Sequence, residues 1–388
     1  MRADIRRVRL GKVCDVERGG SPRPIDSYIT DSEEGVNWIK IGDADHSMYI
    51  TRTAQKIRPE GVKKSRVVHA GDFLLSNSMS FGRPYILKID GCIHDGWLVL
   101  HDRDNVFYKP FLYYYLSAPT TYSRFKAMAV GGVVNNLNSK MVRDLEVPLL
   151  PLDEQKRIAA KLDLLCEIIS KREEQLAKLK QLAKSRFVEV TTPLLEAGQT
   201  VELDSLVDEG RPITYGILKP GQSVEGGIPV VKVKDFPAGE IDESNLLLTS
   251  PSIEAQYKRS RLRAGDLLIS IRGSVGRMAQ VPSSLEGANI TQDTARLTIR
   301  KEYNPVYVRC ALETPALQHE MERNMRGVAI KGINIGFLRK LKIPVPSRKV
   351  QDEVAAFRVL LDKSEFAIRK RLEKARLLYR AKLQEFFG

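Results

Sequence analysis

Apolar residues recur at alternating steps of three and four between Leu152 and Phe187, and Lys, Glu, Gln and Arg fill the positions between them. This stretch of 36 residues contains neither Pro nor Gly. The spacing predicts one long helix with a narrow apolar seam, which needs a partner helix to be stable in water. The seam positions are Ile158, Leu162, Leu165, Ile169, Leu176 and Leu179.

A second stretch, from Lys349 to Phe387, has similar spacing and predicts the partner helix. Because each helix needs the other's seam, the simplest arrangement is an antiparallel coiled coil with the globular parts of the chain at its opposite ends. The seam positions of this second helix are Val354, Phe357, Leu361, Ile368, Leu372 and Tyr379.

The segments that precede the two helices share one sequence pattern. The segment RAGDLLISIRGSVGR, which starts at Arg263, matches HAGDFLLSNSMSFGR, which starts at His69, at an offset of 194 residues. Further matches in the same order have offsets of 192 and 196 residues, and the helices match as well. We therefore predict a tandem duplication of one α+β or mixed α/β domain followed by one long helix, with pseudo-twofold symmetry.

The predicted boundaries are a first domain over residues 1–151, a helix and linker over 152–195, a second domain over 196–348 and a final helix over 349–388. A helix of 36 residues is roughly 54 Å long at 1.5 Å per residue. Successive major-groove faces on one side of DNA recur about every 34–36 Å. Two domains held apart by such a helix could therefore engage one duplex.

The formal net charge of +14 and the pI of about 9.5 favour a polyanionic partner, most simply nucleic acid. All four parts of the chain carry a surplus of Lys and Arg, so a folded basic surface fits better than a basic tail. The four cysteines and five histidines have no metal-site spacing. No apolar run is long enough for a membrane span, and no apolar segment follows the charged N-terminus, so we expect a cytosolic protein without a membrane partner.

Motifs for catalysis are missing. The tetrapeptide nearest to the NPPY type of an amino-methyltransferase, Asn304-Pro305-Val306-Tyr307, lacks the second proline, and no phosphate-binding P-loop motif is present. We expect no catalytic residue, metal or cofactor in this chain.

The candidate DNA contacts lie in loops that the repeat places in both domains. Arg reads guanine and Asn reads adenine with paired hydrogen bonds, whereas Ser and Lys suit phosphate. Ordinary polar turns and solvent-facing lysines are the alternative interpretation. The candidates are Asn77, Ser78, Ser80 and Arg83 with Arg272, Ser274 and Arg277 in the copy; Asn135, Asn136, Asn138 and Lys140 with Lys331 and Asn334; and Lys40 with Lys232 and Lys234.

The chain resembles the specificity subunit of a type I restriction–modification system over essentially all residues. The resemblance is carried by the alternation of domain and helix, by EVPLLPLDEQKRIAAKLD (146–163) and by the AGD…GR segment of both domains. It implies two target recognition domains that each read half of a bipartite, asymmetric DNA sequence. The paired helices would fix the gap and dock two modification subunits. The modification and restriction subunits would carry out adenine N6-methylation and ATP-dependent restriction, with S-adenosylmethionine, ATP and Mg²⁺ bound to them. The complex would act in a bacterial or archaeal cytoplasm.

The second copy departs from the first where the helix begins, because Arg348-Lys349 replaces the acidic Asp153-Glu154 pair. We therefore do not expect both helices to dock their partners identically. Two other functions stay open at this point. One is a coiled-coil scaffold or inhibitor whose duplicated domains bind proteins, and the other is a fused methyltransferase, which the missing motifs disfavour.

Overall fold

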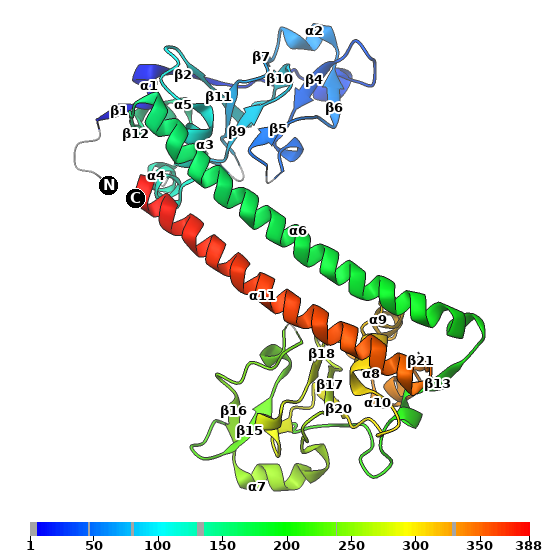
Figure 1. Cartoon of the computed structure of the whole chain (residues 1–388). Coiled ribbons are helices and arrows are strands. Elements are labelled where there is room, and N and C mark those ends of the chain that lie inside the picture. Colours follow the sequence, from blue (N-terminus) through cyan, green and yellow to red (C-terminus); the bar gives the residue numbers. More distant parts are fainter. Residues whose placement is uncertain (1–5, 46, 79–80, 130–135, 238, 328–330) are drawn as a thin grey trace. The chain divides into compact units, whose positions relative to one another are not determined.

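Figure 1 shows the computed structural model, which describes residues 6–45, 47–78, 81–129, 136–237, 239–327 and 331–388. The chain divides into two compact units. Unit 1 comprises residues 1–173 and 370–388, and unit 2 comprises residues 174–369. Each unit therefore contains one globular domain together with parts of two long helices.

The two long helices are α6 (Leu152–Glu196) and α11 (Arg348–Phe387), as the apolar spacing predicts. Helix α6 continues nine residues beyond Phe187 and includes Pro193. A proline so near the end of a helix removes only one backbone hydrogen bond. The extension is held because Thr191 is buried and Val190 packs on the core of unit 2.

Unit 1 contains two five-stranded sheets, with strand orders β2-β11-β8-β9-β5 and β3-β6-β4-β10-β7, and a two-stranded pair β1-β12. The strands are β1 (Arg7–Arg9), β2 (Cys14–Arg18), β3 (Ile29–Thr30), β4 (Val36–Ile39), β5 (Tyr49–Ile50), β6 (Gln55–Ile57), β7 (Arg66–Val68), β8 (Phe73–Ser76), β9 (Pro84–Leu87), β10 (Gly91–Ile93), β11 (Trp97–Asp102) and β12 (Glu146–Pro148). The helices are α1 (Leu10–Val13), α2 (Pro59–Val62), α3 (Lys109–Ser117), α4 (Pro119–Ala129) and α5 (Ser139–Asp144).

Unit 2 repeats this plan with sheets β14-β20-β17-β18 and β16-β15-β19 and the pair β13-β21. The strands are β13 (Thr200–Glu202), β14 (Thr214–Tyr215), β15 (Ile228–Val231), β16 (Leu247–Thr249), β17 (Leu267–Ser270), β18 (Met278–Gln280), β19 (Asn289–Ile290), β20 (Thr294–Leu297) and β21 (Lys342–Pro344). The helices are α7 (Pro251–Glu254), α8 (Pro305–Leu312), α9 (Pro315–Arg323) and α10 (Ile335–Arg339). Short 3-10 helices in the two units are η1 (Ile25–Ser27), η2 (Ile41–Asp43), η3 (Leu203–Leu206), η4 (Val233–Asp235), η5 (Ala255–Ser260) and η6 (Ser283–Leu285).

The strand registers repeat between the units. In unit 1, Trp97 of β11 pairs with Ser76 of β8, and in unit 2 Thr294 of β20 pairs with Ser270 of β17. The parallel pairs repeat too, because Ile93 pairs with Ile39 and Ile290 pairs with Val231. The duplication predicted from the sequence is therefore present in the backbone pairing of both domains.

Both long helices contribute to the core of each domain. In unit 1, Ile158 and Leu162 of α6 and Leu383 and Phe387 of α11 are buried in one cluster with Phe111. The stretches of α6 and α11 that belong to this unit run in opposite directions beside the domain (Figure 1). Burial of one such aromatic side chain stabilises the fold by about 1.5–3 kcal/mol.

In unit 2, Phe187 of α6 and Val354 of α11 lie in the cluster of Tyr307, and the rings of Phe187 and Tyr307 are stacked with centroids 5.5 Å apart. The predicted seam positions of both helices are all buried or half-buried.

A buried glutamine ties each long helix to its own domain. Gln155 of α6 accepts a hydrogen bond from the backbone N–H of Tyr108 (2.8 Å) and donates to the carbonyl oxygens of Val106 and Leu150, each at 2.8 Å. Gln351 of α11 repeats the arrangement, since it accepts from the backbone N–H of Asn304 (3.0 Å) and donates to a carbonyl oxygen at the start of the helix. These contacts fix each domain on the first turn of the helix that follows it.

Candidate nucleic-acid interface

The two predicted DNA loops share one rigid frame at the base of the hairpins β8–β9 and β17–β18. In unit 1 the Ser76 hydroxyl accepts a hydrogen bond from the backbone N–H of Arg83 (2.9 Å), and in unit 2 the Ser270 hydroxyl accepts from Arg277 (2.8 Å). Gly82 (φ +78°) and Gly276 (φ +86°) take a backbone conformation that other residues rarely adopt. The repeated Ser and Gly therefore build the frame of the loop, to which Arg83 and Arg277 contribute backbone N–H groups. The residues between them are free to differ.

In unit 2 the structure brings the two predicted loops together. Arg272 forms an antiparallel bridge with Gly332, and the backbone N–H of Gly273 donates to the carbonyl oxygen of Lys331 (3.0 Å). We call the hollow that they border, with a volume of about 480 Å³, the Arg272 cleft. Its lining residues are Tyr215, Ile271, Arg272, Gln292, Asp293, Asn324, Arg326, Gly332, Ile333, Asn334 and Ile335.

The asparagine predicted in the second loop has a structural task in both units. Asn334 accepts a hydrogen bond from the backbone N–H of Phe337 (2.7 Å) at the start of α10, and Asn138 accepts from Met141 (2.9 Å) at the start of α5. Both are helix N-caps, which explains why this residue recurs in the repeat. Both nevertheless stay exposed, as do Asn136, Lys140 and Lys331.

The structure argues against one candidate in unit 1. The side chain of Asn77 is only 3% exposed, and its amide donates to the carbonyl oxygen of Asp95 (2.9 Å). A buried amide that is already bonded is not available to read adenine, so Asn77 supports the loop from within. Ser78 is half-buried at the surface, whereas Ser80 and Asn135 lie outside the described residues.

The arginines at the end of the predicted loops lie in other hollows. Arg83 lines a cleft of about 380 Å³ with Tyr113 and Tyr122, and Arg277 lines one of about 540 Å³ with Arg309 and Arg358. Arg277 and Arg272 therefore do not line the same cleft, although only four residues lie between them in the sequence. Ser274 is exposed in the loop between them.

The repeated lysines begin two short 3-10 helices. The backbone N–H of Lys40 donates to the carboxylate of Asp43 (2.7 Å), and that of Lys232 donates to Asp235 (2.8 Å). The Lys40 Nζ also donates to Gln55 (2.7 Å). Local turn structure thus explains the recurrence of Asp43 and Asp235, whereas the lysines contribute only backbone N–H groups to it. Among the three predicted lysines, Lys234 is exposed.

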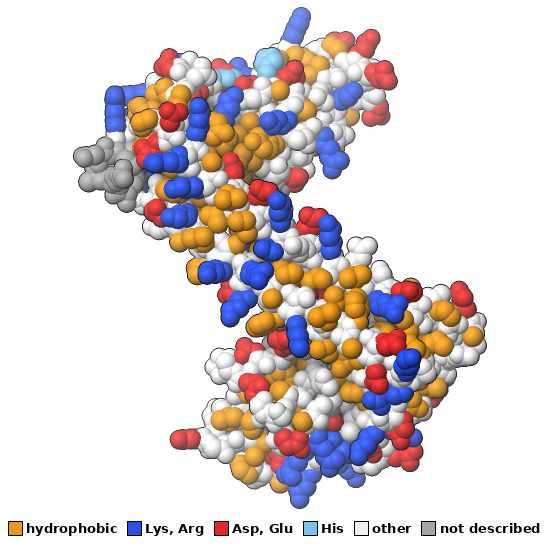
Figure 2. All heavy atoms as spheres, viewed as in Figure 1, with side chains coloured by type: hydrophobic (Ala, Val, Ile, Leu, Met, Phe, Trp, Pro, Cys, Tyr) orange, Lys and Arg blue, Asp and Glu red, His pale blue; other side chains and the backbone are white. Residues whose placement is uncertain are grey.

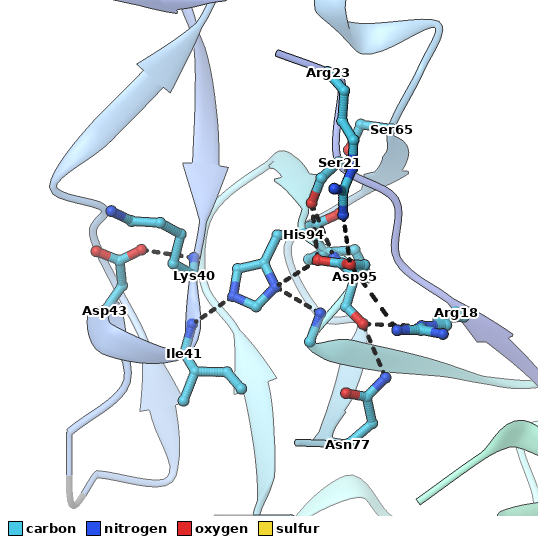
Figure 3. Close-up of polar contacts among 12 residues, drawn as sticks. Arg18, Ser21, Arg23, Lys40, Ile41, Asp43, Ser65, Asn77, His94 and Asp95 are labelled. Atoms are coloured by element: carbon cyan, nitrogen blue, oxygen red, sulfur yellow. Dashed lines mark hydrogen bonds and ion pairs between the residues drawn. The ribbon is translucent and has the colours of Figure 1, made fainter. Parts of the chain in front are cut away.

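A polar cluster in unit 1 was missed by the sequence interpretation (Figure 3). Asp95 accepts a hydrogen bond from the Ser21 hydroxyl (2.9 Å), and its carboxylate lies 4.0 Å from the guanidinium of Arg18 and 3.7 Å from that of Arg23. The side chains of Arg18 and Arg23 are 61% and 82% exposed, so they are accessible to a polyanion. The signal in the sequence was weak, because neither residue is repeated in the second domain.

His94 connects this cluster to the turn at Lys40. The backbone N–H of Ile41 donates to Nε2 of His94 (3.1 Å), and the backbone nitrogen of Gly96 lies 2.6 Å from Nδ1 (Figure 3). Burial lowers the pKa of His94 below its usual value, and the nearby Lys40 lowers it further, against the opposing effects of Asp95 and Asp43. The ring is therefore held in its neutral form.

On the face shown in Figure 2, Lys and Arg side chains are scattered among acidic and hydrophobic ones. Within the described ranges, no group of three or more His, Cys, Asp or Glu side chains is arranged to hold a metal ion. In the same ranges, no helix has the length and apolar character needed to cross a membrane.

Comparisons with known proteins point to one family. The family described as type I restriction modification DNA specificity domain matches residues 3–181 and 218–375. The EcoBI specificity subunit of Escherichia coli is 26% identical over 378 residues, which cover 90% of this chain and 77% of that protein. The putative MjaX specificity subunit of Methanocaldococcus jannaschii is 27% identical over 377 residues, with coverages of 90% and 82%.

Solved structures share the fold at lower identity. The type I restriction–modification S subunit from M. genitalium has a TM-score of 0.60 at 15% identity and covers 100% of this chain and 98% of its own. A chain from a type I restriction–modification system studied for its complex assembly has a TM-score of 0.59 at 20% identity, with coverages of 98% and 97%.

Proposed function

Because the chain belongs to the family of type I restriction modification DNA specificity domains, we propose that it reads a bipartite DNA target, one half-site with each domain. The observation that carries this proposal is the shared frame of the two hairpin loops. Ser76 and Ser270 accept the same backbone hydrogen bond at the base of each loop, while the residues that follow them differ between the units. Two copies of one scaffold with different side chains suit two different half-sites.

The long helices are proposed to set the gap between the half-sites and to dock the modification subunits. Exposed apolar side chains outside the seams support docking, because apolar groups that gather on one surface mark a protein contact. Leu164 on α6 is 57% exposed, and Leu360 and Leu377 on α11 are 61% and 66% exposed. Orange side chains between blue ones in Figure 2 show that apolar groups reach the surface on this face.

Chemistry is proposed to reside in the partner subunits. Methyl transfer to adenine N6 would use S-adenosylmethionine on the modification subunits, and ATP and Mg²⁺ would act on the restriction subunits. The absence of an NPPY-type tetrapeptide and of a P-loop motif from this chain supports that division. This chain would supply position and specificity to the complex.

Sequencing of methylated sites in a cell that carries this chain and its modification partner tests the proposal. We expect one bipartite motif, with two specified half-sites and an unspecified gap. Footprinting with the purified complex should show two protected regions about one helical turn apart, and binding should weaken steeply with salt. A single contiguous footprint would contradict the proposal. If the complex retains no DNA and its behaviour does not change with salt, a protein-binding scaffold is favoured instead.

A further inference from the structure

We infer that Arg272, oriented by Gln292, reads a guanine in the half-site bound by unit 2, and that unit 1 reads a different base at the equivalent place. This inference rests on the proposed function and assigns a specificity-determining residue within it.

Strand register defines which positions of the two units are equivalent. Since Ser76 and Ser270 occupy the same place in the sheet, Ser78 corresponds to Arg272. The parallel pairs of Ile93 and Ile290 make Asp95 equivalent to Gln292.

The neighbouring strand supplies the third position. Arg18 pairs with Leu98 in β11, and Tyr215 pairs with Ala295 in β20, so Arg18 corresponds to Tyr215. The two units thus have a different residue at each of these three equivalent positions, although the strands that carry them pair in the same register.

Arg272 is positioned before any DNA arrives. Its Nη1 donates to Oε1 of Gln292 (3.0 Å), and its backbone is bridged to Gly332. A Cβ on Gly332 would lie 2.6 Å from the carbonyl oxygen of Ile271 and 2.9 Å from Cγ of Arg272. Only glycine therefore allows the loop of Gly332 to lie against the stem of the arginine. A side chain held in this way loses little conformational entropy when it binds.

The remaining N–H groups of Arg272 suit a guanine edge. Guanine presents the acceptors O6 and N7 in the major groove, and a guanidinium fork donates to both. Asp293 lines the same cleft, and its negative charge would repel a phosphate but not a neutral base edge. The cleft therefore favours a base over the DNA backbone for Arg272.

Unit 1 offers a different set of groups. Ser78 is too short to replace Arg272, and the Asp95 carboxylate lies between Arg18 and Arg23. An accessible carboxylate accepts hydrogen bonds and cannot donate to guanine O6 and N7. The two half-sites should accordingly differ at the position these residues face.

The test is methylation-site sequencing in cells that carry the modification partner with Arg272→Lys, Arg272→Ala, Gln292→Ala or Arg259→Ala. Arg272→Lys keeps the charge but loses the fork. We expect discrimination at one guanine of one half-site to fall about tenfold to a hundredfold with either Arg272 variant. The other half-site should keep every letter. Gln292→Ala should relax the same letter less, and Arg259→Ala, which removes an exposed arginine of the same unit, should leave the motif unchanged.

The outcomes separate the two levels of the proposal. If Arg272 contacts phosphate, Arg272→Lys keeps the wild-type motif and Arg272→Ala lowers methylation equally at all sites, which would overturn the inference. A half-site without guanine at the relaxed position would overturn it as well. If the unmodified chain gives no bipartite motif, the proposed function itself fails. Thermal unfolding of each variant identifies any that does not fold, and the letters of the other half-site report intact assembly.

Discussion

His94 makes the polar cluster of unit 1 dependent on a single proton. A neutral ring keeps one unprotonated nitrogen, which accepts the N–H of Ile41 when that nitrogen is Nε2 or the N–H of Gly96 when it is Nδ1. A doubly protonated ring has no acceptor for either group. Gly96 is needed for this arrangement, because a Cβ there would lie 2.1 Å from Cε1 of the ring. The charges that face the ring come from Asp95, Asp43 and Lys40. Protonation would therefore loosen the contact between the Lys40 turn and the Asp95 loop.

The folded state holds the pKa of His94 below the value of 6.5 that applies to the unfolded chain. The unfolded chain then binds the proton more readily. The contribution of His94 to stability is therefore fully present above the unfolded pKa of 6.5 and is lost as the pH falls through the lower pKa of the folded state. We expect the thermal midpoint of unit 1 to fall on acidification from pH 7.5 to 5.5, and to fall less with His94→Gln. His319→Gln, at an exposed histidine, should keep the wild-type slope. Equal slopes for all three proteins would contradict this role.

Among the elements, the two long helices begin with different electrostatics but the same buried glutamine. Acidic Asp153 and Glu154 suit the positive end of the α6 dipole. Arg348 at the start of α11 is unfavourable there, and its pairing with Asp352 (2.9 Å) offsets part of that cost. Gln155 and Gln351 are kept because each bonds to backbone groups that would otherwise be buried without partners.

Replacement of Gln155 by Ala should leave the backbone N–H of Tyr108 and two carbonyl groups without partners. We expect unit 1 to lose roughly 2–5 kcal/mol of stability, with faster hydrogen exchange at Tyr108. Gln351→Ala should produce the same change in unit 2 at Asn304. Gln181→Ala, at an exposed glutamine of α6, should change stability by less than about 0.5 kcal/mol. Unchanged exchange at Tyr108 would show that Gln155 does not hold the domain on the helix.

The elements were more predictable from the sequence than the site. Heptad spacing and the offsets of 192 to 196 residues identified both helices and the duplication, because local periodicity and repetition are visible in one dimension. The residue type of Asn77 predicts a base contact, but its amide is bonded to Asp95, which lies in another loop. Arg18 and Asp95 were overlooked because their proximity follows from the register of β2 and β11. Such long-range register leaves no local mark in a single sequence.

In the proposed function, the two long helices act as a measuring element between the half-sites. A heptad inserted within 176–183 of α6, with a matching heptad in α11, adds about 10.5 Å of helix. That length corresponds to about three base pairs at 3.4 Å each. We expect methylation-site sequencing to show a longer gap between unchanged half-sites. Altered half-site letters with an unchanged gap would contradict the measuring role.

The last turn of α11 is part of the core of unit 1. Phe387 is 1% exposed and packs edge-on against Phe111 and Tyr115, with centroids 5.6 Å from each. Phe387→Ala should cost about 3–5 kcal/mol and speed hydrogen exchange in α3 while unit 2 is unaffected. Phe366→Ala, at a position of α11 that is 57% exposed, is the matched control. Equal exchange in α3 for both variants would show that the contact contributes little.

Unit 1 therefore combines the N-terminal domain with the last turns of α11, whose side chains pack in the core of that domain. During synthesis, residues 1–173 emerge from the ribosome well before Leu383 and Phe387, which belong to the same hydrophobic cluster. The domain that is made first cannot complete its core until translation has passed residue 387. Unit 2, in contrast, has all of its residues as soon as residue 369 has emerged. The order in which the domains are made is thus the reverse of the order in which they can be completed.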